Sequence, residues 1–241
     1  MSNIWHTFFF DPVYNTLVFF IDVFPGGDVG LAIIATVVVV KVILLPLSIK
    51  AVKTQKIMRE IEPKLRAIKE KFKDKREEQA KAMLEIYREA GMNPFASILV
   101  MFIQIPFIIA LYLSVANGGG VPLPDINTEL LYSFIPSPDT VSMIMLGFFD
   151  ITTKNLPLAL AAGITQFIYT RYAMPELAPR EPNSVPTFKD DFARNMQLQM
   201  RYVMPILVIG IAYYFTAAIA LYFVVSNLVT LAQEYVVRRH R

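Results

Sequence analysis

Lys41 is the residue whose type and place most need a chemical explanation. It lies in the middle of residues 30–50, an apolar run that carries no other charge before Lys50. A transmembrane helix needs roughly 20 mostly apolar residues, and a lysine near its centre is unfavourable by a few kcal/mol. At ~1.5 Å per residue, Lys41 lies about 14 Å from Lys50, too deep for its ammonium to reach the interface comfortably. Either the bilayer tolerates the charge by thinning, or, as we favour, Lys41 faces a polar or water-filled space between helices.

Composition excludes most catalytic chemistry. The 241 residues include no cysteine, and the two histidines, His6 and His240, lie at opposite ends of the chain. Thiolate nucleophiles and Cys/His metal clusters are therefore excluded, and the sequence offers no nucleophile–base pair. We expect no enzyme activity, no cofactor and no metal. A hydrophobic content of 55% and a mean hydropathy of +0.46 instead predict a polytopic membrane protein.

The pattern predicts an all-α fold with five transmembrane helices, a cytoplasmic helical hairpin and an N-terminal interfacial helix. The first apolar stretch carries Asp11, Pro12 and Asp22 and is too broken to span a bilayer. Lys and Arg are absent before it, so we expect no cleavable signal peptide. The expected segments are an external interfacial helix and linker (1–29), TM1 (30–49), the hairpin (50–93), TM2 (94–116), an external loop (117–154), TM3 (155–173), a cytoplasmic loop (174–200), TM4 (201–215), TM5 (217–237) and a cytoplasmic tail (238–241).

The hairpin is predicted from periodicity. Residues 50–90 hold thirteen Lys and Arg against eight Asp and Glu. Within them, apolar residues recur every three or four positions, as on one face of a helix: Ile57, Ile61, Leu65, Ile68 and Phe72, then Ala80, Met83 (or Leu84), Tyr87 and Ala90. Two amphipathic helices folded back on each other would bring these faces together.

Charge sets the orientation. The last apolar stretch, residues 202–232, would be ~46 Å long as one helix, against a hydrocarbon core of ~30 Å. Two short spans joined near Thr216–Ala218 instead place Arg201 and the C-terminal arginines on one side, as the positive-inside tendency requires. The segments expected outside hold a single basic residue, Lys154. We expect the N-terminus outside and the C-terminus in the cytoplasm, in the cytoplasmic membrane of a bacterium.

Neutral polar residues fall at a depth similar to that of Lys41. They are Gln104, Gln166, Thr165, Ser226 and Asn227, with Thr170 nearby in sequence. For each alone, hydrogen bonding between helices explains the residue as well as a cavity does. Their shared depth with the lysine favours a hydrophilic substrate groove that is open to the cytoplasm and closed toward the outside.

Several ordered segments resemble the YidC/Oxa-type membrane protein insertases. GLAIIATVVVVKVILLPL resembles the first core helix of that family, and residues 56–94 resemble its cytoplasmic hairpin. FIQIPFIIALY and LYFVVSNLVTLAQEY resemble its second and fifth core helices. Two residue choices differ: the family normally has arginine at the position of Lys41, and a Pro–small–Gly turn at Thr216–Ala217–Ala218. The family's large external domain and its long basic tail, each found in some members, have no counterpart in the sequence.

The resemblance implies an insertase that helps other membrane proteins insert and fold through its groove, without covalent chemistry. Its implied partners are nascent membrane proteins and membrane lipid, with the ribosome and the general secretion channel as candidates. Two alternatives stay open: a small transporter with an anion site at Lys41, and an RNA-binding hairpin on a membrane anchor. The alternating Glu and Lys of residues 50–90 argue against specific nucleic-acid binding.

The predicted topology has a direct test, because the chain lacks cysteine. Single cysteines at Asn127 and Asn183 should react with an impermeant thiol reagent from opposite sides of the membrane. Reaction of both from the same side would contradict the five-span arrangement.

Overall fold

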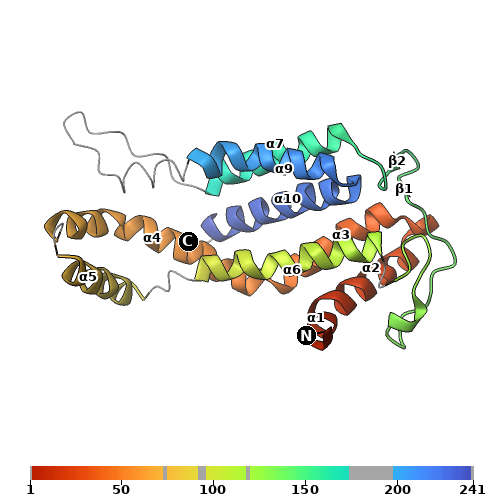
Figure 1. Cartoon of the computed structure of the whole chain (residues 1–241), viewed down its shortest axis with the longest axis horizontal. Coiled ribbons are helices and arrows are strands. Elements are labelled where there is room, and N and C mark those ends of the chain that lie inside the picture. The colour runs from red at the N-terminus through yellow and green to blue at the C-terminus, as the bar shows by residue number, and fades with distance from the viewer. Residues whose placement is uncertain (1, 73–74, 92–95, 118–119, 174–197, 240–241) are drawn as a thin grey trace. The chain divides into compact units, whose positions relative to one another are not determined.

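The computed structural model describes residues 2–72, 75–91, 96–117, 120–173 and 198–239. They are mostly helical (Figure 1), so the all-α class predicted from sequence is confirmed at this level, with one short β-hairpin added. The elements are α1 (Ser2–Trp5), η1 (His6–Phe10), α2 (Asp11–Val23), η2 (Pro25–Gly27), α3 (Val29–Ile43), α4 (Leu45–Lys71), α5 (Arg76–Glu89), α6 (Ala96–Ala116), η3 (Thr128–Leu130), β1 (Ile144–Met145), β2 (Phe149–Asp150), α7 (Leu156–Ala173), η4 (Gln199–Val203), α9 (Met204–Tyr214) and α10 (Ala217–Arg239).

The chain divides into two compact units, which are described one at a time. The first comprises Met1–Ile43 and Pro106–Ala232, and the second comprises Leu44–Ile105 and Gln233–Arg241. The helices α6 and α10 contribute residues to both units.

Apolar length identifies the helices that can cross a membrane. Among the described residues, the segment Ala217–Val237 of α10 is long and apolar enough to do so alone. A second crossing results if Val29–Ile43 and Leu45–Thr54, separated by a break, count as one span. Residues 30–49, the range expected to form TM1, are thus divided between two helices instead of forming a single one. The division falls where α3 ends at Ile43 and Pro46 lies in the first turn of α4. The apolar part of α6, Phe102–Ala116, is shorter.

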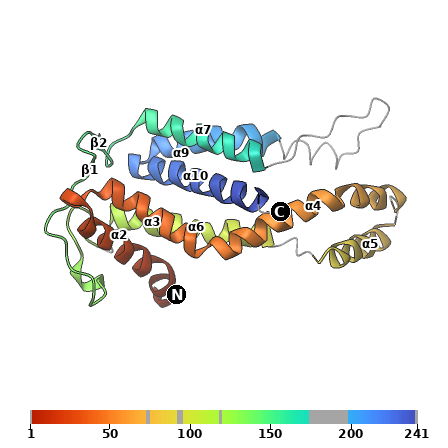
Figure 2. The same cartoon turned by 180° about the vertical axis from the view of Figure 1, so that it is seen from behind.

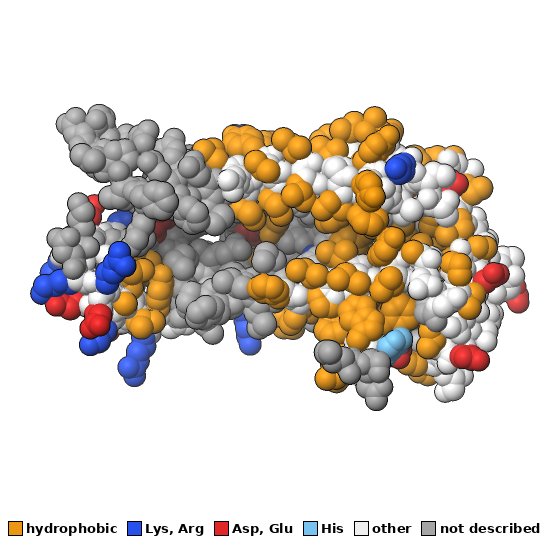
Figure 3. Space-filling model, in the orientation of Figure 1, with side chains coloured by type: hydrophobic (Ala, Val, Ile, Leu, Met, Phe, Trp, Pro, Cys, Tyr) orange, Lys and Arg blue, Asp and Glu red, His pale blue; other side chains and the backbone are white. Residues whose placement is uncertain are grey.

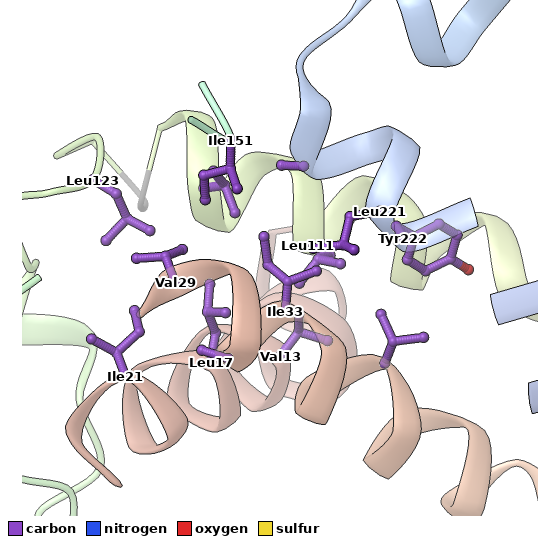
Figure 4. Packing of buried hydrophobic residues seen from close by; sticks show 14 of the residues in the cluster. Val13, Leu17, Ile21, Val29, Ile33, Leu111, Leu123, Ile151, Leu221 and Tyr222 are labelled. Carbon is purple, nitrogen blue, oxygen red and sulfur yellow. The ribbon is translucent and has the colours of Figure 1, made fainter. Parts of the chain in front are cut away.

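The core of the first unit forms where α2, α3, α6 and α10 meet. Val13, Leu17 and Ile21 line one face of α2 at helical spacing, and α3 presents Val29 and Ile33 to them. Leu111 of α6 and Leu221 and Tyr222 of α10 complete the cluster (Figure 4). The N-terminal helix therefore packs against α3 through the apolar positions that the sequence placed on it.

Small residues bring α7, α9 and α10 together, and the three helices run side by side in both views (Figures 1 and 2). Ala159 and Ala162 of α7 meet Ala212 of α9 and Ala220 of α10. At Gly163 a side chain would run into Ile209 of α9. Small residues let helix backbones approach one another closely. Helices pack in this way where the surrounding lipid is as apolar as their side chains.

The α6–α7 loop (residues 120–155) packs onto the helix ends of the first unit. The buried amide of Asn15 donates to the Leu130 carbonyl and accepts from the Tyr132 amide at 2.9 and 2.7 Å. The carboxylate of Asp28 accepts the amides of Leu31 and Leu146. Of the apolar patches in this loop, Ile135 and Met145 face the core, while others face outward.

The break between α9 and α10 leaves backbone amides that need acceptors. Phe215 is extended, and α10 begins at Ala217. The loop supplies the acceptors: Ala217 donates to the Thr153 carbonyl at 2.8 Å, and Ala218 donates to that of Ile151 at 3.1 Å. Two of the amides left unsatisfied at a helix N-terminus are thereby bound.

The surface of the first unit is apolar over its helices. Figure 3 shows hydrophobic side chains along these helices, with acidic side chains gathered over the loop end. Exposed large apolar residues occur on every long helix of this unit, among them Phe19, Val42, Ile109, Ile164, Ile206 and Leu228. Such a surface suits lipid better than water.

The second unit contains the helical pair α4–α5. Ile61 and Leu65 are buried, and Ile57 of α4, Met83, Ile86 and Tyr87 of α5, and Ala90 just after α5 pack against them. Except for Ile86, these are positions that the periodicity selected. Of the two alternatives at one position, Met83 packs in this seam, whereas Leu84 is exposed. Charged residues lie outside this seam, as in the exposed pairs Arg66–Glu62 and Lys75–Glu78.

The seam gives a matched pair of tests. Leu65→Asp should separate α4 from α5, because it places a carboxylate in an apolar contact and removes a leucine side chain whose burial contributes at least about 2 kcal/mol. Faster hydrogen exchange throughout residues 57–89 would report the separation. Leu84→Asp is the control, since Leu84 is 65% exposed; equal exchange in the two variants would contradict the packing.

Candidate functional site

Lys41 is buried in the first unit, near the end of α3. Its side chain is 6% exposed, and its Nζ donates to Thr230 Oγ1 of α10 at 2.9 Å. An ammonium has three donors and no acceptor, so a buried lysine needs oxygen atoms around it. The sequence predicts a polar setting for Lys41, and Thr230 is one part of that setting.

Thr230 was not among the residues singled out from the sequence. Its hydroxyl donates to the Ser226 carbonyl one turn earlier at 2.7 Å while accepting from Lys41. Ser226 itself is buried. The spacing of four residues places Ser226 and Thr230 on one face of α10, and that signal could have added Thr230 to the list once Ser226 was on it.

Asn227 lies on a different face of α10 from Ser226 and Thr230. Its Nδ2 donates to Thr165 Oγ1 at 3.3 Å and to the Ala162 carbonyl at 3.4 Å, both on α7. Thr165 also donates to the Ala161 and Ala162 carbonyls of its own helix. Neighbours in a helix point about 100° apart, so Ser226 turns toward the Lys41 side while Asn227 binds α7. These contacts are of the helix-to-helix kind that the sequence left open for each neutral residue.

The two glutamines of the predicted groove, Gln166 and Gln104, lie in different units. Gln166 Nε2 donates to Thr170 Oγ1 within α7 at 3.3 Å, and Thr170 returns a hydrogen bond to the Gln166 carbonyl. Gln104 belongs to the second unit, whereas Lys41 belongs to the first. The structure thus joins Lys41, Thr230 and Ser226 in one cluster and Asn227 with Thr165 in another.

The chemistry of these clusters is that of binding rather than bond-breaking. In the first, a cation donates to a hydroxyl that itself donates to a carbonyl, and in the second an amide joins two helices. In the described part of the chain, His, Asp and Glu do not gather in threes as they would around a metal ion. A helical protein with an apolar surface and a buried cation has the character of an α-helical membrane protein.

Comparison with known proteins identifies the family. The model of the 60Kd inner membrane protein family matches residues 20–241. Membrane protein insertase YidC of Oceanobacillus iheyensis is 31% identical over 244 residues, which cover 99% of this chain and 85% of that protein. Membrane protein insertase YidC 2 of Bacillus anthracis is 29% identical over 98% of this chain and 82% of its own length. A longer relative, membrane protein insertase YidC of Syntrophobacter fumaroxidans, is 30% identical, and the match covers 39% of it.

The chain therefore belongs to the 60Kd inner membrane protein family, whose relatives named above are bacterial membrane protein insertases. The resemblance to YidC/Oxa-type insertases is confirmed, and the family is one of insertases rather than of enzymes. These names support an insertase function, and none of them is that of a transporter.

The contact between Lys41 and Thr230 can be measured by a double-mutant cycle. Thr230→Val removes the hydroxyl and should destabilise the protein by about 1.5–3 kcal/mol, the range for a hydrogen bond to a charged group. Thr230→Ser is the matched control that keeps the acceptor. In a Lys41→Met background, Thr230→Val should lose most of its effect. Thermal unfolding in lipid nanodiscs gives the values, and an unchanged effect in that background would show that the two side chains are not coupled.

Proposed function

We propose that this protein inserts other membrane proteins through a hydrophilic groove whose cation is Lys41. A short hydrophilic segment of the substrate enters from the cytoplasm and is attracted by the ammonium, while its apolar segment moves along the open side into lipid. The reaction forms no covalent bond and uses no cofactor or metal.

The single observation that supports this most is the burial of the Lys41 ammonium, with its Nζ hydrogen-bonded to the Thr230 hydroxyl. A lysine at membrane depth is unfavourable unless it has a role or compensating groups, and Thr230 supplies one of the hydrogen bonds that such a cation needs. Such a cation attracts carboxylates and peptide carbonyls, which are the groups hardest to move through hydrocarbon. In the proposal, Ser226, Asn227, Thr165, Gln166 and Gln104 keep the groove polar.

The proposed topology has five spans, with the N-terminus outside and the C-terminus in the cytoplasm of a bacterium. In it, α3, α6, α7, the η4–α9 segment and α10 cross the membrane, α2 lies at the outer interface, and the α6–α7 loop is external. The helix from Gln199 to Tyr214 is about 24 Å long at 1.5 Å per residue, shorter than a ~30 Å hydrocarbon core. This supports local thinning of the bilayer near the groove.

The α4–α5 pair is proposed to lie in the cytoplasm and to guide incoming chains. Many of its apolar residues pack in its own seam, and the surface that it offers to partners carries charges of both signs, with Leu84 exposed among them. Nascent membrane proteins and lipid are the partners of this proposal, with the ribosome and the general secretion channel as candidates for contact with this pair.

Substitution of Lys41 tests the electrostatic step in cells depleted of their own insertase. Lys41→Arg should retain insertion, because it keeps the charge. Lys41→Glu should lower insertion about tenfold or more, equivalent to at least ~1.4 kcal/mol, and most for substrates with an acidic translocated segment. Lys41→Ala should fall between them, since the neutral residues remain.

The control applies the same charge reversal where the side chain is exposed. Lys50→Glu should leave insertion near the unmodified level, because the Lys50 side chain is exposed rather than buried among other helices. All variants are compared at matched expression, using a single-span substrate with a reporter for translocation. Equal activity of the Arg, Ala and Glu variants at position 41 would overturn the electrostatic mechanism.

A further inference from the structure

The β1–β2 hairpin of the α6–α7 loop has two unlike sides. Met143 and Met145 pack against the core of the first unit. Ile144, Leu146 and Phe148 point away from it and are 50%, 55% and 67% exposed. Alternation of this kind is expected of a strand with one buried face, but water would favour polar residues on the other face. This hairpin carries apolar side chains on both.

The turn of the hairpin holds its leucine in an unusual conformation. Met145 accepts the Phe148 amide across the turn at 3.2 Å, and Leu146 and Gly147 have φ of 53° and 80°. Glycine or asparagine is favoured at such positions, and a branched, bulky residue is strained there. A strained backbone that displays an exposed leucine points to a use for that side chain.

The base of the hairpin is polar. Asp150 Oδ1 accepts the hydroxyl of Thr152 at 2.6 Å and its amide at 2.8 Å. These hydrogen bonds, that of the hydroxyl first, lower the pKa of the Asp150 carboxyl, which is therefore ionised at neutral pH. The hairpin thus has an apolar tip and a charged base.

The surroundings of the base are those of a membrane interface. The next residues bind the start of α10, through the carbonyls of Ile151 and Thr153. At the adjacent end of α9, Lys154 Nζ lies 6.0 Å from the centre of the Tyr213 ring and 5.6 Å from that of Tyr214. Tyrosines and a lysine at the end of an apolar helix are typical of the boundary between headgroups and acyl chains.

We propose that the tip of the β1–β2 hairpin is a lipid anchor: Ile144, Leu146 and Phe148 insert into the headgroup and upper acyl region of the leaflet beside the α9–α10 break. Lipid is favoured over a second protein copy because a stable protein interface needs about 20–30 residues a side, and this hairpin exposes four large apolar residues, these three and Phe149. Insertion holds the loop in place, and with it the acceptors for the Ala217 and Ala218 amides.

Spin labelling tests the anchor in the full chain. Single cysteines at Leu146, Phe148 and Asp139 carry a nitroxide, with the protein in nanodiscs of phosphatidylcholine and phosphatidylglycerol. Asp139 is the control, an exposed polar residue of the same loop. Labels at Leu146 and Phe148 should collide with oxygen several times more often, relative to a water-soluble nickel chelate, than the label at Asp139.

Two results would overturn the proposal. A ratio at Leu146 and Phe148 equal to that at Asp139 would place the tip in water. Low collision rates with both reagents would mean that protein covers the tip, and relief of that protection with one chain per nanodisc would identify a second copy. The outcome is independent of insertion activity, so failure of the anchor leaves the proposed function untouched.

Discussion

A buried cation in an apolar helix is the constraint around which the first unit is organised. Lys41 requires oxygen acceptors inside the protein, and Thr230 of α10 supplies one. Leu221 and Tyr222 of the same helix pack in the main core, and Ala220 packs against α7 and α9. Asn227 donates a hydrogen bond to Thr165. Because α10 packs against α7 through Ala220 and Asn227 and against the main core through Leu221 and Tyr222, the position of Thr230 beside Lys41 is fixed by packing on several sides.

A second requirement is that helix ends next to lipid leave few backbone groups without partners. The α6–α7 loop meets part of it by binding Asn15, Asp28 and the first amides of α10. At Gly27 a side chain would run into the Thr140 backbone, and at Gly30 a Cβ would lie 2.5 Å from that of Met145. This close approach shows that the loop is part of the fold rather than a passive linker, and it links α2, α3 and α10 at their common end.

Features that depend on local pattern could be predicted from the sequence, and features that depend on long-range pairing could not. Ile61 and Leu65 meet Met83 and Tyr87 because a period of 3.6 residues decides which face is apolar. The break near Thr216 follows from length and charge. The pairing of Lys41 with Thr230 depends instead on how α3 packs against α10, which a single sequence does not reveal. The β1–β2 hairpin was missed because its turn has leucine where the usual signal is asparagine or glycine.

Lysine at position 41 suits a hydroxyl acceptor such as that of Thr230 and, in the proposed function, an unselective task. A guanidinium presents five donors in a rigid plane and favours acceptors that match this geometry. An ammonium is a compact point charge whose donors rotate, so the Thr230 hydroxyl can bind it without fixing the direction of its field. In the proposed function the substrate segments share no sequence, only carbonyl dipoles and carboxylates. A point charge attracts these groups in many orientations, so under the proposed function the ammonium of Lys41 needs no fixed geometry in the segments that it attracts.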